Sequence, residues 1–240
     1  MSRRRFFVPE VRRGLAELTG SDAEHLVRVL RAEVGQLYEI SDNRDVYLAK
    51  VNTARKSLVV FQVTEKLPEP PAAVRKTLCA ALVKFERFEW LIEKATELGV
   101  AAIQPFECAR SERGLALAAV KRIARWEKIA VEASQQSRRA RLPVIGPPCE
   151  FADAVRTDAT VRLLLDEDPA APPLLKAIPE QRSSADRIAL LLGPEGGWRD
   201  EEREEALTVG WTACSLGQTI LRAETAGIAA LAIVTAAWST

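Results

Sequence analysis

Two glycine-containing stretches of the chain have the residue types of a ligand-binding pocket. The first runs from Leu190 to Trp198 with the sequence LLLGPEGGW, and the second runs from Leu216 to Ala226 with the sequence LGQTILRAETA. Each marks a point where an apolar run stops in a turn. Because ligands of α/β proteins bind at the carboxyl ends of strands, we predict that the two turns line one pocket.

The first turn, Gly193–Gly197, suits a neutral or cationic ligand. A phosphate-binding loop is excluded because no Lys-Ser or Lys-Thr pair follows the glycines and their spacing is not GxGxxG. The carboxylate of Glu195 would repel an anion. Glycines let the backbone approach a ligand closely, and the alternative explanation is a tight strand-to-helix turn.

The second turn offers an apolar wall followed by two charged side chains. Ile220 and Leu221 can flank a flat ring whose edge is recognised by backbone groups. Glu224 falls in the first turn of a predicted helix, where the helix dipole favours a carboxylate, and Arg222 can simply pair with it. Local sequence alone therefore does not assign catalysis to either residue.

The elements that position these turns are strands that alternate with helices after residue 70. The alternation predicts an α/β domain whose parallel sheet is covered on both faces. The predicted strands are Thr77–Val83, Val100–Phe106, Val161–Leu165, Ile188–Leu192 and Thr212–Leu216. The predicted helices are Phe85–Leu98 ended by Gly99, Lys121–Ser137, Glu201–Leu207 capped by Asp200, and Arg222–Trp238.

The first part of the chain is predicted to be a small β-barrel. Its strands are Gln36–Ile40, Val46–Val51 and Leu58–Thr64, and one helix, Ala23–Leu30, is capped by Ser21 or Asp22. Short strands around a single helix are typical of a small barrel. The proline-rich segment Leu67–Pro71 interrupts regular structure, so we predict two domains, residues 1–70 and 71–240.

Composition narrows the class of protein further. The four cysteines form no CxxC pair and His25 is the single histidine, which argues against a zinc site or a disulfide framework and suits the cytoplasm. The N-terminus has no apolar run before Pro9, so we expect no signal peptide. The longest apolar run, Gly227–Trp238, is too short to span a membrane.

The net charge is +1, but basic residues are concentrated in two regions. The segment Cys108–Leu142 carries a surplus of six positive charges, and the first 31 residues carry a surplus of three. In the latter, His25 lies beside Arg28 and Arg31. These regions indicate a nucleic-acid-binding face or two ordinary solvated surfaces, and charge alone does not distinguish the two.

The order of several short motifs resembles that of the bacterial 16S rRNA uridine N3-methyltransferases, which belong to the SPOUT or trefoil-knot class. Each motif is weak, but their order and spacing together are specific and extend through most of the chain. The motifs are Arg5-Phe-Phe-Val8, His25–Arg31 with Gly35, Lys84, Glu93–Val100 with Pro105, Arg110-Ser111, Glu132-Ala133, Gln136-Ser137, Arg139, Pro143, Gly193–Gly197 with Glu202, Leu216-Gly217 and Ile220–Ala226.

The resemblance implies a SPOUT domain with a C-terminal trefoil knot, preceded by a PUA-like barrel. It further implies a homodimer that acts on 16S rRNA or on an assembled small ribosomal subunit. S-adenosyl-L-methionine would bind in a bent form at Leu192, Gly193, Pro194, Glu195, Gly196, Gly197, Leu216, Gly217, Ile220 and Leu221. RNA would contact Arg5, His25, Arg28, Arg31, Lys84, Lys94, Arg110 and Arg139.

The methyl group on a sulfonium is electrophilic, so no metal is needed. Uracil N3 carries a proton, and the site must remove it or stabilise the negative charge that spreads onto the two carbonyl oxygens. We expect Arg222 to stabilise the negative charge and Glu224 or Glu195 to be the base. Two alternatives stay open at this point. They are a SPOUT enzyme with another RNA target, such as the ribose 2′-oxygen of a tRNA, and a non-catalytic RNA-binding or ribosome-assembly factor.

The chain departs from the family pattern at several positions. Trp198 stands where the family prefers Phe, which preserves the apolar character. Arg199 replaces a usual Ser or Thr, and Arg138 replaces a frequent glycine. Thr219 and Ala223 replace a frequent Arg and a frequent Thr inside the second turn, which affects the expected cofactor contacts more than the backbone shape.

Overall fold

The computed structural model describes residues 5–68, 74–112, 114–168 and 170–239, which form two compact units. One unit consists of residues 1–71 and 134–142, and the other consists of residues 72–133 and 143–240. The predicted boundary at Leu67–Pro71 lies mostly outside the described residues. The inclusion of residues 134–142 in the first unit has no counterpart in the sequence prediction.

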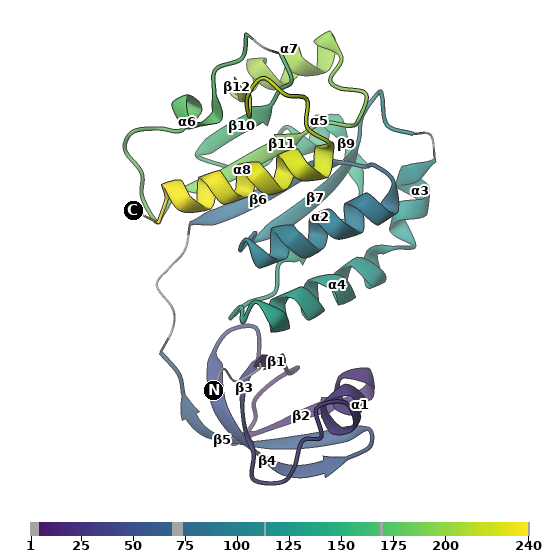
Figure 1. Cartoon of the computed structure of the whole chain (residues 1–240), viewed down its shortest axis with the longest axis vertical. Helices are drawn as coiled ribbons and strands as arrows, with labels where there is room; N and C mark the ends of the chain where they lie inside the picture. The colour runs from purple at the N-terminus through teal and green to yellow at the C-terminus, as the bar shows by residue number, and fades with distance from the viewer. Residues whose placement is uncertain (1–4, 69–73, 113, 169, 240) are drawn as a thin grey trace. The chain divides into compact units, whose positions relative to one another are not determined.

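A parallel sheet forms the centre of the second unit (Figure 1). Its order is β12-β10-β11-β6-β7-β8, with β9 paired to β7, and every pair of neighbours is parallel. The parallel sheet predicted from alternating apolar runs is therefore confirmed. Its strands are β6 (Arg75–Ala81), β7 (Ala102–Glu107), β8 (Val144–Ile145), β9 (Cys149–Glu150), β10 (Val161–Leu165), β11 (Arg187–Leu192) and β12 (Thr212–Cys214).

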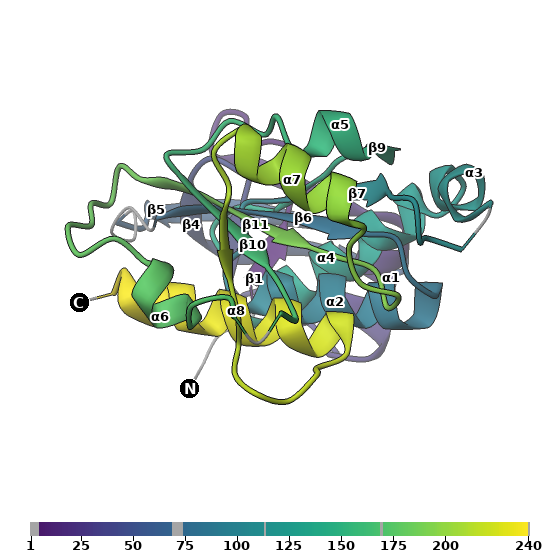
Figure 2. The ribbon, with the colours of Figure 1, turned by 90° about the horizontal axis from the view of Figure 1, so that it is seen from above.

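Helices cover both faces of this sheet, with α2 and α8 on one face and α5 and α7 on the other (Figure 2). Alternate side chains of β11 explain the two layers, because Leu190 and Leu192 pack toward α2 and α8 while Leu191 packs toward Trp211. The helices of the chain after β6 are α2 (Phe85–Glu97), α3 (Leu115–Val120), α4 (Ile123–Gln136), α5 (Phe151–Ala154), α6 (Leu174–Ala177), α7 (Asp200–Thr208) and α8 (Ala223–Ala237).

Close packing fixes α8 against α2 and β11. A Cβ atom added at Gly227 would lie 3.0 Å from side-chain atoms of both Leu192 and Leu91, so the glycine permits the close approach. At the other end of α8, the buried Lys76 ammonium donates to the Leu98 carbonyl at 3.0 Å and to Thr235 Oγ1 at 2.6 Å. These contacts hold the helix whose N-terminus follows the second glycine turn.

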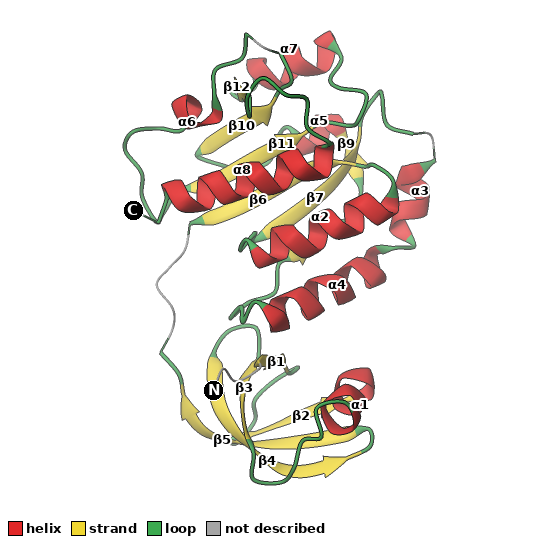
Figure 3. Cartoon of the chain, in the orientation of Figure 1, coloured by secondary structure: helices red, strands yellow, loops and turns green. Residues whose placement is uncertain are grey.

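The first unit is a strongly curled five-stranded sheet with α1 packed against it (Figure 3). Its order is β1-β3-β4-β5-β2, and its core includes Phe6, Leu26, Ile40 and Phe61. The three predicted strands are confirmed, while β1 and β2 were not predicted. The elements are β1 (Arg5–Phe7), β2 (Leu15–Thr19), α1 (Gly20–Arg28), β3 (Leu37–Ser41), β4 (Val46–Arg55) and β5 (Leu58–Lys66).

Two predicted helix caps are wrong. Helix α1 already begins at Gly20, so Ser21 and Asp22 lie inside it. Asp200 likewise lies inside α7, where its carboxylate accepts a hydrogen bond from Arg203 at 2.9 Å. Arg199 is the N-cap residue, and the Glu202 carboxylate reaches back and accepts from the Arg199 N–H at 3.0 Å.

Candidate active site

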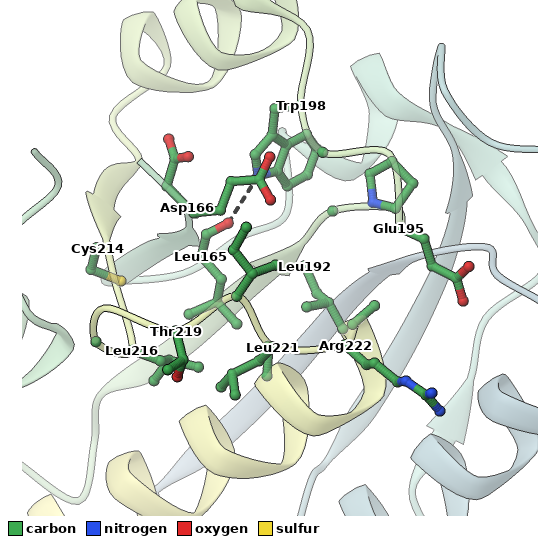
Figure 4. Close-up of a pocket in the computed structure, with 18 of the residues that line it drawn as sticks. Leu165, Asp166, Leu192, Glu195, Trp198, Cys214, Leu216, Thr219, Leu221 and Arg222 are labelled. Carbon is green, nitrogen blue, oxygen red and sulfur yellow. Dashed lines mark hydrogen bonds between the residues drawn. The ribbon is translucent and has the colours of Figure 1, made fainter. Parts of the chain in front are cut away.

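A pocket of about 300 Å³ lies at the carboxyl ends of β10, β11 and β12 (Figure 4). The segment 192–198 lines it except for Gly196, and residues 216–223 line it from the other side. The structure thus brings the two predicted turns into one pocket. A third strand end, residues 165–167, completes the wall and was not predicted.

The interior of the pocket is mainly apolar. Leu165, Leu192, Leu216 and Leu221 line it from three separate segments, and Cys214, the last residue of β12, lines one side. Burial, and then the charge of Asp166, raise the pKa of the Cys214 thiol to about 12. The thiol is therefore neutral at physiological pH and is part of the apolar lining, not a nucleophile.

Trp198 joins the ends of two strands. Its indole N–H donates to the Leu165 carbonyl at 2.9 Å, the dashed line of Figure 4, and its ring stacks on Phe106. A Cβ atom at Gly193 would lie 2.8 Å from the indole ring, so only glycine fits there without a shift of the ring. The Trp198 ring thus fixes the geometry of the first turn.

The charged side chains of the pocket are three carboxylates and two guanidinium groups. Glu195 forms an ion pair with Arg87, and in Figure 4 Glu195 and Arg222 extend toward the side away from Cys214. Asp166 pairs with Arg203 at 2.6 Å. Burial acts to raise the pKa of the Asp166 carboxyl. The hydrogen bonds and charge of Arg203, together with hydrogen bonds from the backbone N–H groups of Asp168 and Glu167, outweigh burial and lower the pKa below its ordinary value.

Contacts behind the first turn hold its backbone in place. The Arg110 guanidinium donates to the Gly196 carbonyl at 2.8 Å and to the Trp198 carbonyl at 3.1 Å. The buried Glu202 carboxylate accepts from the Ala109 N–H at 2.8 Å as well as from the Arg199 N–H. The loop after β7 therefore supports the turn after β11.

The two predicted catalytic residues occupy different environments. Arg222 precedes α8 and lines the pocket. Glu224 is only 5% exposed, is not part of the pocket lining, and its Oε2 atom has no hydrogen-bond partner among the described residues. The geometry thus brings Arg222 and Glu195 to the pocket and leaves Glu224 behind its wall.

Several residues of the pocket were not predicted from the sequence. Asp166 and Glu167 follow β10 directly, and an acidic pair after a buried strand is a signal that could have been used. Arg87 had no such signal, because an arginine in the first turns of an amphipathic helix looks like an ordinary solvated residue. Among the described residues, no group of three or more metal-ligating side chains is close enough to hold an ion.

The predicted RNA-binding residues are distributed over both units. His25, Arg28, Arg31 and Lys84 are exposed, and burial lowers the pKa of the Arg139 guanidinium to about 10. Four have protein partners: Arg5 binds Glu39 at 2.8 Å, Lys94 binds Glu93 and Glu97, Arg110 binds the first turn, and Arg139 donates to the Arg141 carbonyl at 3.1 Å. Arg5 and Arg138 meet on the same carboxylate, Glu39, within the first unit.

Comparison with known proteins places this pocket in context. Residues 70–235 match the RNA methyltransferase domain family. A ribosomal RNA small subunit methyltransferase E from Synechocystis sp. is 35% identical over 223 residues, which cover 91% of this chain and 72% of that protein.

Two solved structures have the same fold and cover 99% of this chain and 98% of their own. One is a ribosomal RNA small subunit methyltransferase E from Neisseria gonorrhoeae bound to S-adenosyl methionine, with 28% identity and a TM-score of 0.86. The other is a putative methyltransferase from Legionella pneumophila in complex with the same cofactor, with 28% identity and a TM-score of 0.88.

None of the helices described in this chain has the length and hydropathy to cross a membrane.

Proposed function

Because the chain belongs to the ribosomal RNA small subunit methyltransferase E family, we propose that it transfers a methyl group from S-adenosyl-L-methionine to N3 of a uridine in 16S rRNA. The observation that carries the proposal is the single pocket formed by the two glycine turns and the end of β10. The substrate is the small ribosomal subunit or its rRNA.

The pocket fits the chemistry of this cofactor. Its leucine walls suit the flat adenine ring, and the carboxylates of Asp166, Glu167 and Glu195 suit a ligand that carries positive charge. The absence of side chains at Gly193 and Gly197 leaves the backbone of the first turn close to the ligand. When bound, the cofactor supplies an electrophilic methyl group on a sulfonium. The proposed cofactor-binding set is the one expected from sequence without Gly196, which does not line the pocket, and with residues 165–167 added.

The protein must then activate a weak nucleophile. Arg222 orients the uracil ring. It also stabilises the negative charge that spreads onto the carbonyl oxygens of uracil when N3 loses its proton. Of the two candidate bases, Glu195 is favoured over Glu224, because Glu195 lines the pocket and Glu224 does not. If Arg222→Ala retained full turnover with unchanged cofactor affinity, the role of Arg222 would be abandoned.

The finer architecture is part of the same proposal. We propose a trefoil knot in residues 190–226. It is supported by the strand order, because the chain passes from β11 across β10 and forms β12 on the opposite side of β10. The curled sheet of the first unit supports a PUA-like RNA-binding domain in residues 1–70, followed by the methyltransferase domain in residues 71–240. The enzyme is proposed to be a cytoplasmic homodimer, in the compartment where ribosomes are assembled.

One experiment tests the function directly. The protein is incubated with methyl-labelled cofactor and small subunits that lack the modification, and the labelled nucleoside is then identified and mapped. Label in N3-methyluridine of 16S rRNA supports the proposal, whereas label in a ribose 2′-O-methyl nucleoside assigns another RNA target. Calorimetry with the cofactor adds a second readout, because a protein that binds none is a non-catalytic RNA-binding or assembly factor.

A further inference from the structure

A second, smaller pocket adjoins the first one. It has a volume of about 100 Å³ and shares Pro194 and Glu195 with the larger pocket. Its other walls are residues 82–84, which connect β6 to α2, residues 110–112 of the loop after β7, and Leu115 at the start of α3. Glu195 therefore lies at the boundary between the two pockets.

The lining of the smaller pocket combines apolar walls with both kinds of hydrogen-bonding group. Leu82, Val83 and Leu115 are apolar, while Lys84 and Arg110 are donors. The two carboxylates, Glu112 and Glu195, are acceptors that disfavour a phosphate group. A small, flat, neutral ring with donors and acceptors on one edge matches this lining better than an anion does.

We propose that the smaller pocket receives the uracil ring of the target nucleotide after it leaves its stack in the RNA. The inference rests on the proposed function and names the part of the site that selects the base. The edge of uracil presents a carbonyl, the N3–H group and a second carbonyl. Lys84 and Arg110 can donate to carbonyl oxygens, and Glu195 can accept from N3–H at the boundary with the cofactor pocket.

Glu195 is suited to this position because it is held there. Arg87, which lines the larger pocket, forms an ion pair with it, and Arg110 binds the carbonyls on either side of Gly197. In the reaction, the N3 proton passes to the Glu195 carboxylate and the N3 electron pair forms the bond to the methyl carbon. The bond between that carbon and sulfur breaks, its electron pair stays on sulfur, and the positively charged sulfonium becomes a neutral thioether.

The arrangement also explains how the base would be selected. Cytosine presents an unprotonated N3, whose lone pair would face the Glu195 carboxylate and leave that acceptor without a donor. The methylated product likewise has no N3–H to donate, so its affinity for the pocket falls and release is favoured. The pocket therefore distinguishes uracil both from cytosine and from its own product.

The test compares Lys84→Met with the matched variant Lys176→Met. Both lysines are exposed residues of the second unit, but only Lys84 lines the smaller pocket, and neither lines the larger one. We expect Lys84→Met to slow single-turnover labelling of small subunits about tenfold or more, from the loss of one charged hydrogen bond, with cofactor affinity unchanged in calorimetry. Lys176→Met should match the wild type in both measurements.

A binding measurement without turnover completes the test. Ligand-observed NMR with free uridine and free cytidine is performed on wild-type protein saturated with S-adenosylhomocysteine. Uridine should bind more strongly than cytidine, and Lys84→Met should weaken the uridine signal. Equal binding of the two nucleosides, or wild-type labelling by Lys84→Met, overturns the base pocket. Failure of the wild type to bind cofactor or label rRNA overturns the proposed function instead, so the two failures are distinguishable.

Discussion

The two turns that form the pocket differ in how firmly the rest of the protein holds them. The first turn, residues 193–198, is bound through Arg87 to Glu195, through Arg110 to two carbonyls, and through the Trp198 indole to β10. The second turn exposes residues 217–220 consecutively, with Ile220 82% exposed. Within the described chain, no side chain from Gln218 to Arg222 forms a hydrogen bond or ion pair.

This difference suggests a division of labour between the turns. The first turn is a preorganised wall whose shape is set before any ligand arrives, so its substitution should reduce both stability and binding. The second turn has little to lose in the free protein, so its substitution should reduce binding alone. Substitutions in each turn therefore distinguish effects on stability from effects on binding alone.

Gly193→Ala should cause the largest loss. The added Cβ would lie 2.8 Å from the buried Trp198 ring, and the ring cannot move freely because it is hydrogen-bonded to Leu165. We expect a loss of about 3 kcal/mol in the free energy of unfolding and no measurable cofactor binding. Chemical denaturation and calorimetry measure the two effects.

The control for this variant lies in the same turn. Gly196→Ala would place its Cβ 3.4 Å from Arg110 at the nearest, an ordinary contact, so its stability should stay within about 0.5 kcal/mol of the wild type. Equal destabilisation by the two alanines would show that the Trp198 contact does not set the shape of the first turn.

Glu202→Ala should have the second-largest effect. The substitution leaves the Ala109 and Arg199 N–H groups without the carboxylate that now binds both, and it separates the loop after β7 from the first turn. We expect a loss of about 2 kcal/mol in stability and a weaker cofactor complex. Glu201→Ala, at the exposed neighbouring position, is the matched variant and should lose a few tenths at most.

Stability at alkaline pH tests how well the second turn keeps water away from Cys214, the last residue of β12. Burial holds the pKa of Cys214 at about 12 in the folded state, above the ordinary value of 9.0 that applies to the unfolded chain. Only the unfolded state then ionises between these values, so this thiol should reduce stability by about 1.4 kcal/mol per pH unit as pH rises through that window.

The measurement is urea denaturation at several pH values between 8 and 10.5, roughly the lower part of that window, for the wild type and Cys214→Ala. The free energy of unfolding should fall more steeply with pH in the wild type than in Cys214→Ala. The difference in stability between the two proteins at pH 8 is subtracted before the slopes are compared. Equal slopes would mean that water reaches Cys214 through an open second turn, which would make the contrast between the turns greater than the structure shows.

The sequence predicted the parts of the fold that continuous apolar runs specify. The strands β10 and β11 are buried on both faces, so they are apolar at nearly every position and are recognisable without alternation. Helix α2 was recognisable from one apolar face, of which Phe88, Leu91 and Ile92 are buried. The glycine turns were found because they stop apolar runs abruptly.

The parts that the sequence did not predict depend on contacts between distant segments. Strands β8 and β9 have two residues each, too few for a periodic pattern. Residues 134–142 belong to the first unit because Arg138 binds Glu39 and the Ser41 hydroxyl donates to the Ala140 carbonyl, contacts that span 99 residues. The ion pair of Arg87 with Glu195 is also non-local. The sequence around Arg87 and the sequence around Glu195 therefore give no sign that Arg87 lines the pocket.

Ile220→Ala should have the smallest effect on stability and is the sharpest test of the comparison. The side chain lines the pocket rim while remaining 82% exposed, so its truncation should change the free energy of unfolding by less than about 0.5 kcal/mol. If the turn closes over the adenine ring, the lost apolar contact should weaken cofactor binding about fivefold, equivalent to about 1 kcal/mol. Calorimetry on this variant beside Leu117→Ala, an 80% exposed leucine of α3 outside the pocket, separates a cofactor contact from a general surface effect. Unchanged affinity in Ile220→Ala would mean that the exposed turn does not close over the ligand, and the first turn alone would then account for binding.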